Sequence, residues 1–152
     1  MTGAPRRRLV ALRAAVALAL AAGAAGCAST GGRSPEEEQV TVRLSAPRST
    51  AVRRTLDAMR AQGYRVRESL TSGTEMTTEP FRHGDDVEAV FRAAVSGSGG
   101  TSRIVLSGTY HRKQFGGIVR TSDEPVRRAT EGVEGELWAR LQNLGLAIRS
   151  AR

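Results

Sequence analysis

The sequence of 152 residues has one cysteine, Cys27, and one lysine, Lys113. A chain with a single cysteine cannot form an intramolecular disulfide, even in an oxidising compartment, so its fold has to be stabilised by packing. Basic charge comes almost entirely from arginine, because Lys113 is the only lysine among 23 basic residues.

Motifs for phosphate or acyl chemistry are also missing. A phosphate-binding loop needs Gly-Lys-Ser/Thr at the start of a helix, whereas the glycine-rich run Gly97–Gly100 precedes Ile104-Val105-Leu106, which has the character of a strand. No serine stands in a Gly-x-Ser-x-Gly elbow. The sequence therefore gives no support to a nucleotide-binding loop or to the nucleophile elbow of a serine hydrolase.

Candidate ligating or catalytic side chains are few, since the chain has only two histidines. His83, Asp85 and Asp86 fall in one short stretch between strand patterns, where we predict a solvated hairpin turn instead of a metal site. His111 ends another strand pattern and is followed by two basic residues, so we predict that it faces water without an acidic neighbour. We accordingly expect no catalytic residue, no bound metal and no cofactor.

The N-terminal stretch is the most informative part of the sequence. Arg6, Arg7 and Arg8 form a basic head, and an apolar run rich in Ala, Leu and Val follows as far as Gly26. Its uncharged part, Ala14–Gly26, has 13 residues, and this length suits a signal peptide better than a membrane span of about 20 residues. An ordinary secretory signal with an Ala-x-Ala cleavage site also fits the alanines before Gly26.

The run ends in Ala24-Ala25-Gly26-Cys27, and this stretch resembles the signal peptide of bacterial lipoproteins, in which small residues directly precede a cysteine. The resemblance implies cleavage between Gly26 and Cys27. It also implies a diacylglycerol on the sulfur of Cys27, which anchors the mature chain to a membrane. Ala24 stands where this family usually has leucine. The consecutive arginines of the basic head leave twin-arginine export open beside the general route.

Cleavage would leave one domain behind a short tether. Loss of the signal peptide, residues 1–26, removes four arginines and lowers the formal net charge from +8 to +4. Residues 27–38 are then the lipidated cysteine and a flexible polar tether, which reaches about 18 Å on average. Residues 39–150 have the length of a single domain. The small, scattered charge excess and the exported location argue against nucleic-acid binding.

Alternation and helical spacing predict the elements of this domain. We expect strands at 40–44, 64–67, 74–81, 87–95 and 104–110, with a weaker strand pattern at 117–121. A loop at 96–101 joins the strongest pair into a hairpin. Pro80 marks a sheet edge or a bulge. Helices are expected from Ser49 or Thr50 to Gly63 and from just after Pro125 to residue 148.

This order predicts an α+β fold, with an antiparallel sheet of four to six strands and two helices packed on one face. The final helix should be integral to the core through its apolar stripe of Leu137, Leu141, Leu144 and Ile148. Its expected contacts on the sheet are Phe91, Ala93, Ile104 and Leu106.

Two short matches, Gly63-Tyr64 after the first helix and Thr77-Thr78 in the third strand, accompany this order of elements. Together they are similar to the small helix-grip modules of the lipoproteins that accompany the outer-membrane β-barrel assembly machine. The resemblance implies a fold and carries no function with it.

These expectations favour a lipid-anchored protein of the cell envelope that binds another protein and has no catalytic role. Its partners are the membrane, through the anchor, and an envelope protein. The contact surface would be the edge strands and the sheet face without helices, around Val90, Arg92, Val105 and Ser107. The alternative is a small periplasmic hydrolase or ligand-binding lipoprotein that uses His83, Asp85, Asp86 or His111. The outer membrane is favoured over the inner one, because residues 28 and 29 lack the aspartate that retains some lipoproteins in the inner membrane.

Overall fold

The computed structural model of the chain describes residues 38–68, 73–113 and 123–151. The predictions for the signal segment with Cys27, for the tether up to residue 37 and for a strand at 117–121 fall outside these residues.

Seven strands and two helices occur in the described ranges. In chain order they are β1 (Val40–Leu44), α1 (Arg48–Ala61), β2 (Val66–Glu68), β3 (Glu75–Thr78), β4 (Phe81–His83), β5 (Val87–Ser98), β6 (Thr101–Arg112), β7 (Glu124–Pro125) and α2 (Gly132–Ser150). The strands form one antiparallel sheet in the order β1-β6-β5-β3-β2, with β4 paired to β5 and β7 paired to β6.

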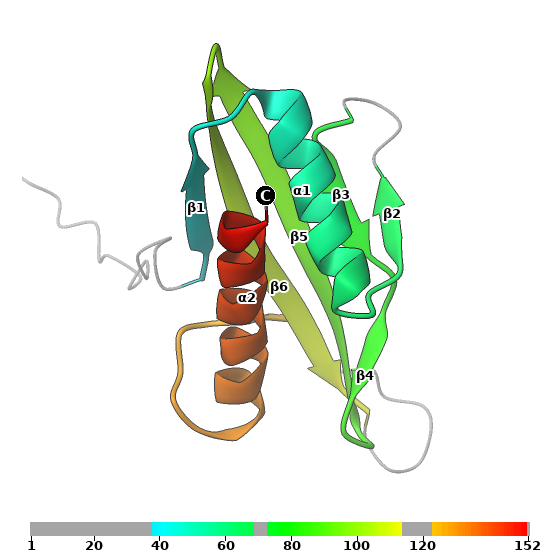
Figure 1. Cartoon of the computed structure of the whole chain (residues 1–152). Coiled ribbons are helices and arrows are strands. Elements are labelled where there is room, and N and C mark those ends of the chain that lie inside the picture. The colour runs from blue at the N-terminus through cyan, green and yellow to red at the C-terminus, as the bar shows by residue number, and fades with distance from the viewer. Residues whose placement is uncertain (1–37, 69–72, 114–122, 152) are drawn as a thin grey trace, which may run out of the picture. The chain divides into compact units, whose positions relative to one another are not determined.

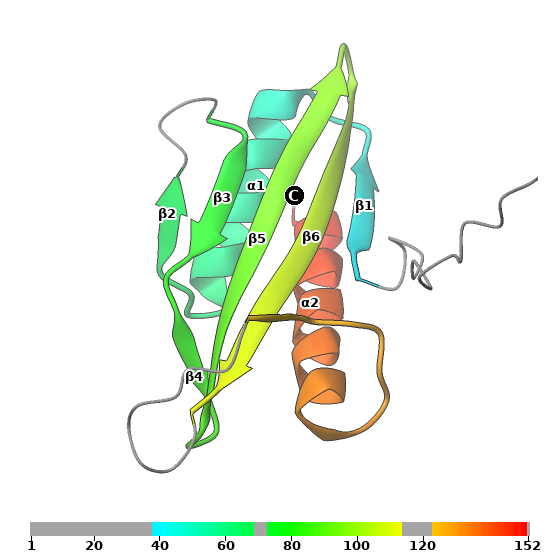
Figure 2. The ribbon, with the colours of Figure 1, turned by 180° about the vertical axis from the view of Figure 1, so that it is seen from behind.

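Both helices lie on the same side of this sheet, and among the described residues no helix covers the other side (Figure 1 and Figure 2). The predicted α+β class and the placement of both helices on one face are confirmed. The short strands β4 and β7 bring the strand count to seven, one more than the largest number expected. The sheet therefore has a helix side, which both helices cover, and an open face on the opposite side.

The hairpin of β5 and β6 forms the centre of the sheet, as predicted. Its residues on the helix side are buried and comprise Val87, Ala89, Phe91, Ala93, Val95, Ile104, Leu106, Gly108 and Tyr110. The connection is tighter than the expected loop at 96–101, because the strands pair up to Ser98 and Thr101. Only Gly99 and Gly100 remain in the turn, and the φ of +64° at Gly99 is a left-handed value that favours glycine.

The predicted third strand, 74–81, is two strands separated by a bulge. β3 ends its pairing with β5 at Thr77, and β4 resumes the pairing at Phe81, so that three residues on this side face two residues of β5. This count defines a β-bulge, and Pro80 lies inside it, where a residue without an N–H group is tolerated. The prediction of an edge or a bulge at Pro80 is therefore confirmed. The prediction of one continuous strand over 74–81 is wrong.

Thr78 compensates for the interrupted ladder at this bulge. Its hydroxyl oxygen accepts a hydrogen bond from the backbone N–H of Phe91 at 2.9 Å. Both residues are almost fully buried, so an unpaired N–H group at this position would be costly. A side chain thus replaces the backbone acceptor that the bulge moves away.

Helix α1 begins and ends by different means. The start predicted at Ser49 or Thr50 is wrong, because the helix begins at Arg48, directly after Pro47, and no side chain caps it. The end at Gly63 is confirmed by a φ of +84°. The N–H groups of Gly63 and the next residue bond back to the last turn at 2.9 and 3.1 Å, which is the pattern of a Schellman cap.

Helix α2 begins at Gly132, so the start predicted just after Pro125 is wrong. It buries the stripe that the sequence predicts, namely Leu137, Leu141, Leu144 and Ile148. It packs mainly on β1 and β6, whereas β5, which carries Phe91 and Ala93, is contacted mainly by α1. Gly145 permits a close approach to β1, since a Cβ atom there would lie 3.1 Å from the Cγ1 atom of Val40. In the described ranges no helix has the length and apolar character needed to cross a membrane.

The folded domain starts slightly earlier than the sequence suggested. Glu38, assigned to the tether, forms an ion pair with Arg127, whose Nε atom lies 3.2 Å from the Glu38 Oε1 atom. The backbone N–H of Arg127 in turn donates to the Glu134 side chain at the start of α2. The last tether residue is therefore held against the domain.

Candidate functional site

The open face of the sheet carries a pair of arginines on adjacent strands. Arg43 of β1 lies directly opposite Arg103 of β6, and Arg103 lies opposite Ser96 of β5. Both arginines are exposed, and within the described residues neither forms an ion pair. Like charges directly opposite each other on a sheet are destabilising, so an acidic ligand at this position would relieve a repulsion that the free protein contains.

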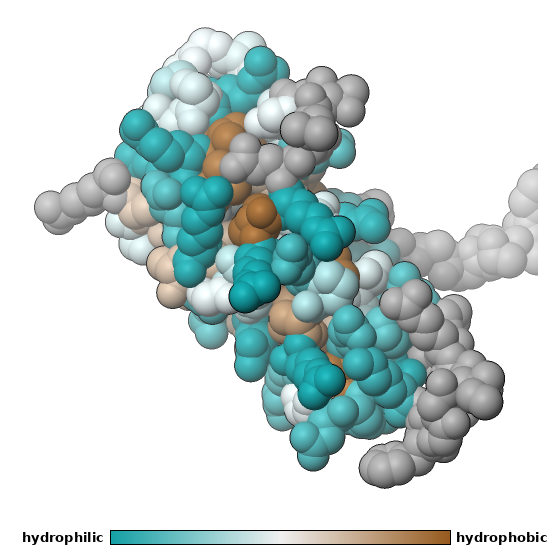
Figure 3. Space-filling view, turned by 90° about the vertical axis from the view of Figure 1, so that its right-hand side faces the viewer, coloured by the Kyte–Doolittle hydropathy of each residue, from teal (hydrophilic) through white to brown (hydrophobic). Residues whose placement is uncertain are grey.

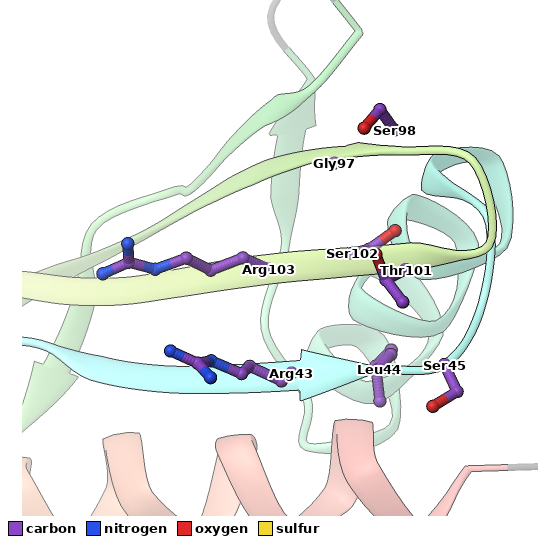
Figure 4. Close-up of a pocket in the computed structure, with 8 residues that line it drawn as sticks. All are labelled: Arg43, Leu44, Ser45, Gly97, Ser98, Thr101, Ser102 and Arg103. Carbon is purple, nitrogen blue, oxygen red and sulfur yellow. The ribbon is translucent and has the colours of Figure 1, made fainter.

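A hollow of about 590 Å³ adjoins this pair at the turn end of the β5–β6 hairpin. Figure 4 shows the side chains of Arg43 and Arg103 extending in the same direction from their neighbouring strands. Hydroxyl groups of Ser45, Ser98 and Thr101 also line the hollow. The arrangement offers guanidinium and hydroxyl donors on one open surface, which suits carboxylate or phosphate groups.

The residues predicted as a contact surface do lie together on the open face. Arg92 is opposite Ser107, and Val105 and Val90 belong to the neighbouring pairs of the same two strands. Arg92 is exposed and the other three are partly exposed. Arg92, Val105 and Ser107 line a smaller hollow of about 240 Å³ together with residues of β3.

A third hollow, of about 320 Å³, lies between β1 and α2 at the edge of the sheet. Val40 and Val42 line it from the strand, and Gly145 and Leu146 line it from the helix. Leu146 is 59% exposed, and it is the large hydrophobic residue that stands out to solvent in the described part of the chain. Gln142, Asn143 and Arg149 complete the lining of this groove, which therefore combines one exposed apolar side chain with polar and basic ones.

The opposite edge of the sheet, at β2, differs from the β1 edge in its charge pairing and in the hydropathy of its surface. Arg65 and Arg67 lie 3.9 and 3.5 Å from the carboxylate of Glu79, which offsets one of their two positive charges. Figure 3 shows this side of the domain, where hydrophilic residues predominate and hydrophobic ones form small separate patches. The uncompensated arginines and the groove belong to the β1 edge.

The structure corrects the placement of His83. The sequence put it in a solvated turn, but His83 ends β4, is only 9% exposed and donates from Nε2 to a carboxylate oxygen of Glu136 at 2.8 Å. Its Nδ1 atom is buried without a hydrogen-bond partner. The sequence contained no signal for this contact, because Glu136 belongs to α2. Asp85 and Asp86 are exposed in the turn that follows, as predicted.

The prediction that His111 faces water is wrong as well. His111 is 7% exposed, and its two ring nitrogens lie 3.6 Å from a Glu88 oxygen and 3.4 Å from an Asp123 oxygen. Each ring nitrogen therefore faces a carboxylate, which leaves neither nitrogen open to a substrate. Glu88 also contacts Lys113, whose Nζ atom lies 3.0 Å away.

The sheet does not bring the two histidines together. His83 pairs with Val87, and both side chains lie on the helix side of the sheet. His111 pairs with Glu88, the next residue along β5, and both of these lie on the open face. The four residues considered for a hydrolytic or metal site thus fall into separate places. Within the described ranges, no three His, Cys, Asp or Glu side chains are arranged to hold one metal ion.

Tyr110 is a further buried polar residue near the base of the hairpin. Its hydroxyl donates to Glu124 of β7 at 3.1 Å. Burial raises the pKa of Tyr110, and the hydrogen bond to Glu124 and the negative charges of Glu124 and Glu134 act in the same direction. This contact fastens β7 to β6, and it is a structural role that needs no ligand.

Sequence reasoning identified the open face but missed Arg43, Arg103 and Leu146. The two arginines meet only through the pairing of β1 with β6, which a local pattern does not reveal. Comparison with known proteins adds no further assignment: no protein-family model matches the chain, and a search of curated proteins finds no relative.

Proposed function

We propose that this chain is a lipid-anchored protein of the cell envelope, and that its folded domain binds another envelope protein without catalysing a reaction. The observation that supports this most directly is the uncovered sheet face beside the β1 edge. Arg43 and Arg103 stand opposite each other there without an acidic partner among the described residues. An acidic partner would reduce the repulsion between these two arginines more than solvent does.

The anchor is the second part of the proposal. A diacylglycerol on Cys27 would place two acyl chains in the bilayer, and at about 0.8 kcal/mol per buried methylene this gives stable attachment where a single chain does not. The tether would then keep the domain close to the membrane surface, where a protein partner of the envelope is at high local concentration. We propose the outer membrane as its location.

The alternative of a small hydrolase or ligand-binding lipoprotein has less support. Its candidate residues, His83 and His111, lie on opposite faces of the sheet and engage carboxylates from different elements. Neither arrangement combines a nucleophile, a base and an accessible cavity, which is what a hydrolytic site requires. We therefore propose a binding module.

Photo-crosslinking in native membranes tests the binding role. A photoreactive residue at Ala94, which is exposed on the open face, should capture one envelope protein. The matched control is the same residue at Asp57, which is exposed on α1. Equal capture from both positions, or none from Ala94, would contradict the proposal.

Substitution of the anchor residue tests the attachment. Cys27→Ser should abolish lipid labelling and release the protein from membranes in a carbonate wash. Retention of the substituted protein in the washed membrane fraction would show that Cys27 is not the anchor. The result is independent of the crosslinking outcome, so the two parts of the proposal stand or fall separately.

A further inference from the structure

We infer that the free edge of β1 is a docking site for an extended, acidic segment of a partner protein, which adds a strand to the sheet beside β1. The inference rests on the proposed function and deepens it, since it names the surface that binds and the chemistry of what is bound. Three features of the β1 edge support it: an unpaired strand edge, a groove with an exposed leucine, and uncompensated arginines.

The strand edge provides backbone groups for pairing. β1 is the outermost strand at its end of the sheet and pairs only with β6 in the described part of the chain. Figure 1 shows α2 alongside β1 on the helix side, so the helix does not occupy the strand's outer edge. Extended peptides bind such edges through main-chain hydrogen bonds, and alternate side chains of the peptide determine specificity.

The groove between β1 and α2 defines what one set of those side chains should be. Val40 and Val42 point from β1 toward the helix side. On α2 the exposed Leu146 lines the groove together with Gln142, Asn143 and Arg149. A strand paired to β1 would place every second side chain over this groove. Apolar side chains there would cover Leu146 and remove its surface from water.

The arginines define the other set. Thr41 and Arg43 point from β1 to the open face, and Arg103 is the cross-strand neighbour of Arg43. Both arginines are exposed, and neither forms an ion pair within the described residues. The side chains of a docked strand that face this surface should therefore be carboxylates.

Two other occupants fit the same edge less well. Antiparallel pairing of β1 with a second copy would bring two Arg43 side chains close together, which like-charge repulsion disfavours. An anionic membrane surface would attract the arginines but would offer no regular donors and acceptors to the strand edge. A partner of alternating apolar and acidic residues satisfies all three features.

The test uses the full lipidated protein in nanodiscs of phosphatidylcholine. The probe is a fluorescent peptide of alternating valine and glutamate, long enough to pair with all of β1, and the matched probe has lysine in place of glutamate. By fluorescence anisotropy the acidic peptide should bind and the basic one should not. Arg43→Glu and Leu146→Glu should each weaken binding by about tenfold or more, as hot-spot residues do. The control Arg140→Glu, at an exposed position of α2 that does not line the groove, should change it by no more than about twofold.

Two N-methylated versions of the acidic peptide test backbone pairing. Each carries methyl groups on one alternate set of amides, so that only one version loses the N–H groups that face β1. One version should bind about tenfold more weakly and the other about as well as the parent. Equal binding of both versions would show attraction to the arginines without strand addition.

Several outcomes would overturn the inference. These are no binding of the acidic peptide, equal binding of the acidic and basic peptides, or unchanged binding by Arg43→Glu. Displacement of the peptide by vesicles containing phosphatidylglycerol would assign the arginines to the membrane, and dimerisation that Arg43→Glu alters would assign the edge to a second copy. If the peptide fails but crosslinking from Ala94 still captures a protein, the inference falls and the proposed function remains.

Discussion

On the helix side of the β5–β6 hairpin, alternate residues are buried in a shared core, whereas the residues between them form the open face and include Arg92 and Arg103. The same two strands therefore carry two kinds of surface. The helix side contributes stability through the removal of apolar area from water. The open face contributes little, because exposed charges interact weakly across solvent. Substitutions should separate the two faces by the size and the sign of their effects.

The largest effect is expected for Leu141→Ala on the helix side. Leu141 is fully buried in the core, and emptying such a site costs about 2–5 kcal/mol of unfolding free energy. Denaturant titration of the purified protein measures the loss. The matched control is Leu146→Ala in the same helix, which should change stability by less than about 0.5 kcal/mol because the side chain is exposed. Similar losses for both would remove the distinction between the core and the groove.

A smaller loss is expected for Thr78→Val at the bulge. Valine keeps the shape of threonine but removes the oxygen that accepts the Phe91 N–H, so that a buried donor loses its partner. This should cost about 1–3 kcal/mol. The adjacent Thr77 is on the open face, and Thr77→Val should be nearly neutral. If the two substitutions have equal effects in thermal melts, Thr78 does not compensate for the bulge.

A substitution on the open face should raise the free energy of unfolding instead of lowering it. Arg43→Glu replaces a like-charge pair with an opposite-charge pair across from Arg103, and it should raise stability by about 0.2–1 kcal/mol at low salt. High salt should reduce the gain, because exposed charges are screened. The double substitution Arg43→Glu with Arg103→Glu restores the repulsion and should cancel the gain. A salt-independent change would point to a cause other than charge.

The smallest effect at neutral pH concerns Tyr110. Its pKa is raised in the folded protein, so its contribution to stability is fully present below the unfolded value of about 10 and is lost as the pH rises through the folded value. Thermal melts across this alkaline range should show a decline that Tyr110→Phe lacks. An equal decline in the phenylalanine variant would show that Tyr110 is not its cause.

Local patterns predicted those parts of the fold that depend on neighbours in sequence. Alternation predicted which residues of β5 and β6 are buried on the helix side. Helical spacing predicted the buried stripe of α2, and Gly63 predicted the end of α1. Each of these features is decided within a few residues of itself. The α+β class followed because the order of elements restricts how their apolar surfaces can meet.

Contacts between distant segments could not be predicted in this way. His83 was expected in water because its neighbours form a turn, but Glu136 reaches it from α2. His111 was expected in water for a similar reason, and Asp123 approaches it from the segment before β7. The arginine pair depends on the register of β1 against β6. Burial and charge pairing at these sites are properties of the assembled sheet.

The position of β1 also has a consequence for the order in which the domain folds. β5 and β6 are joined by a two-residue turn and can pair as soon as both exist, whereas Leu44 pairs with Ser102, far along the chain. Closing so long a loop has an entropic cost that a tight hairpin avoids, and contacts of this kind slow folding. Among the described strands β1 comes first along the chain, and it is one of the last to pair. Until β1 pairs with β6, its valine-rich side stays exposed, and exposed apolar strands of this kind favour aggregation.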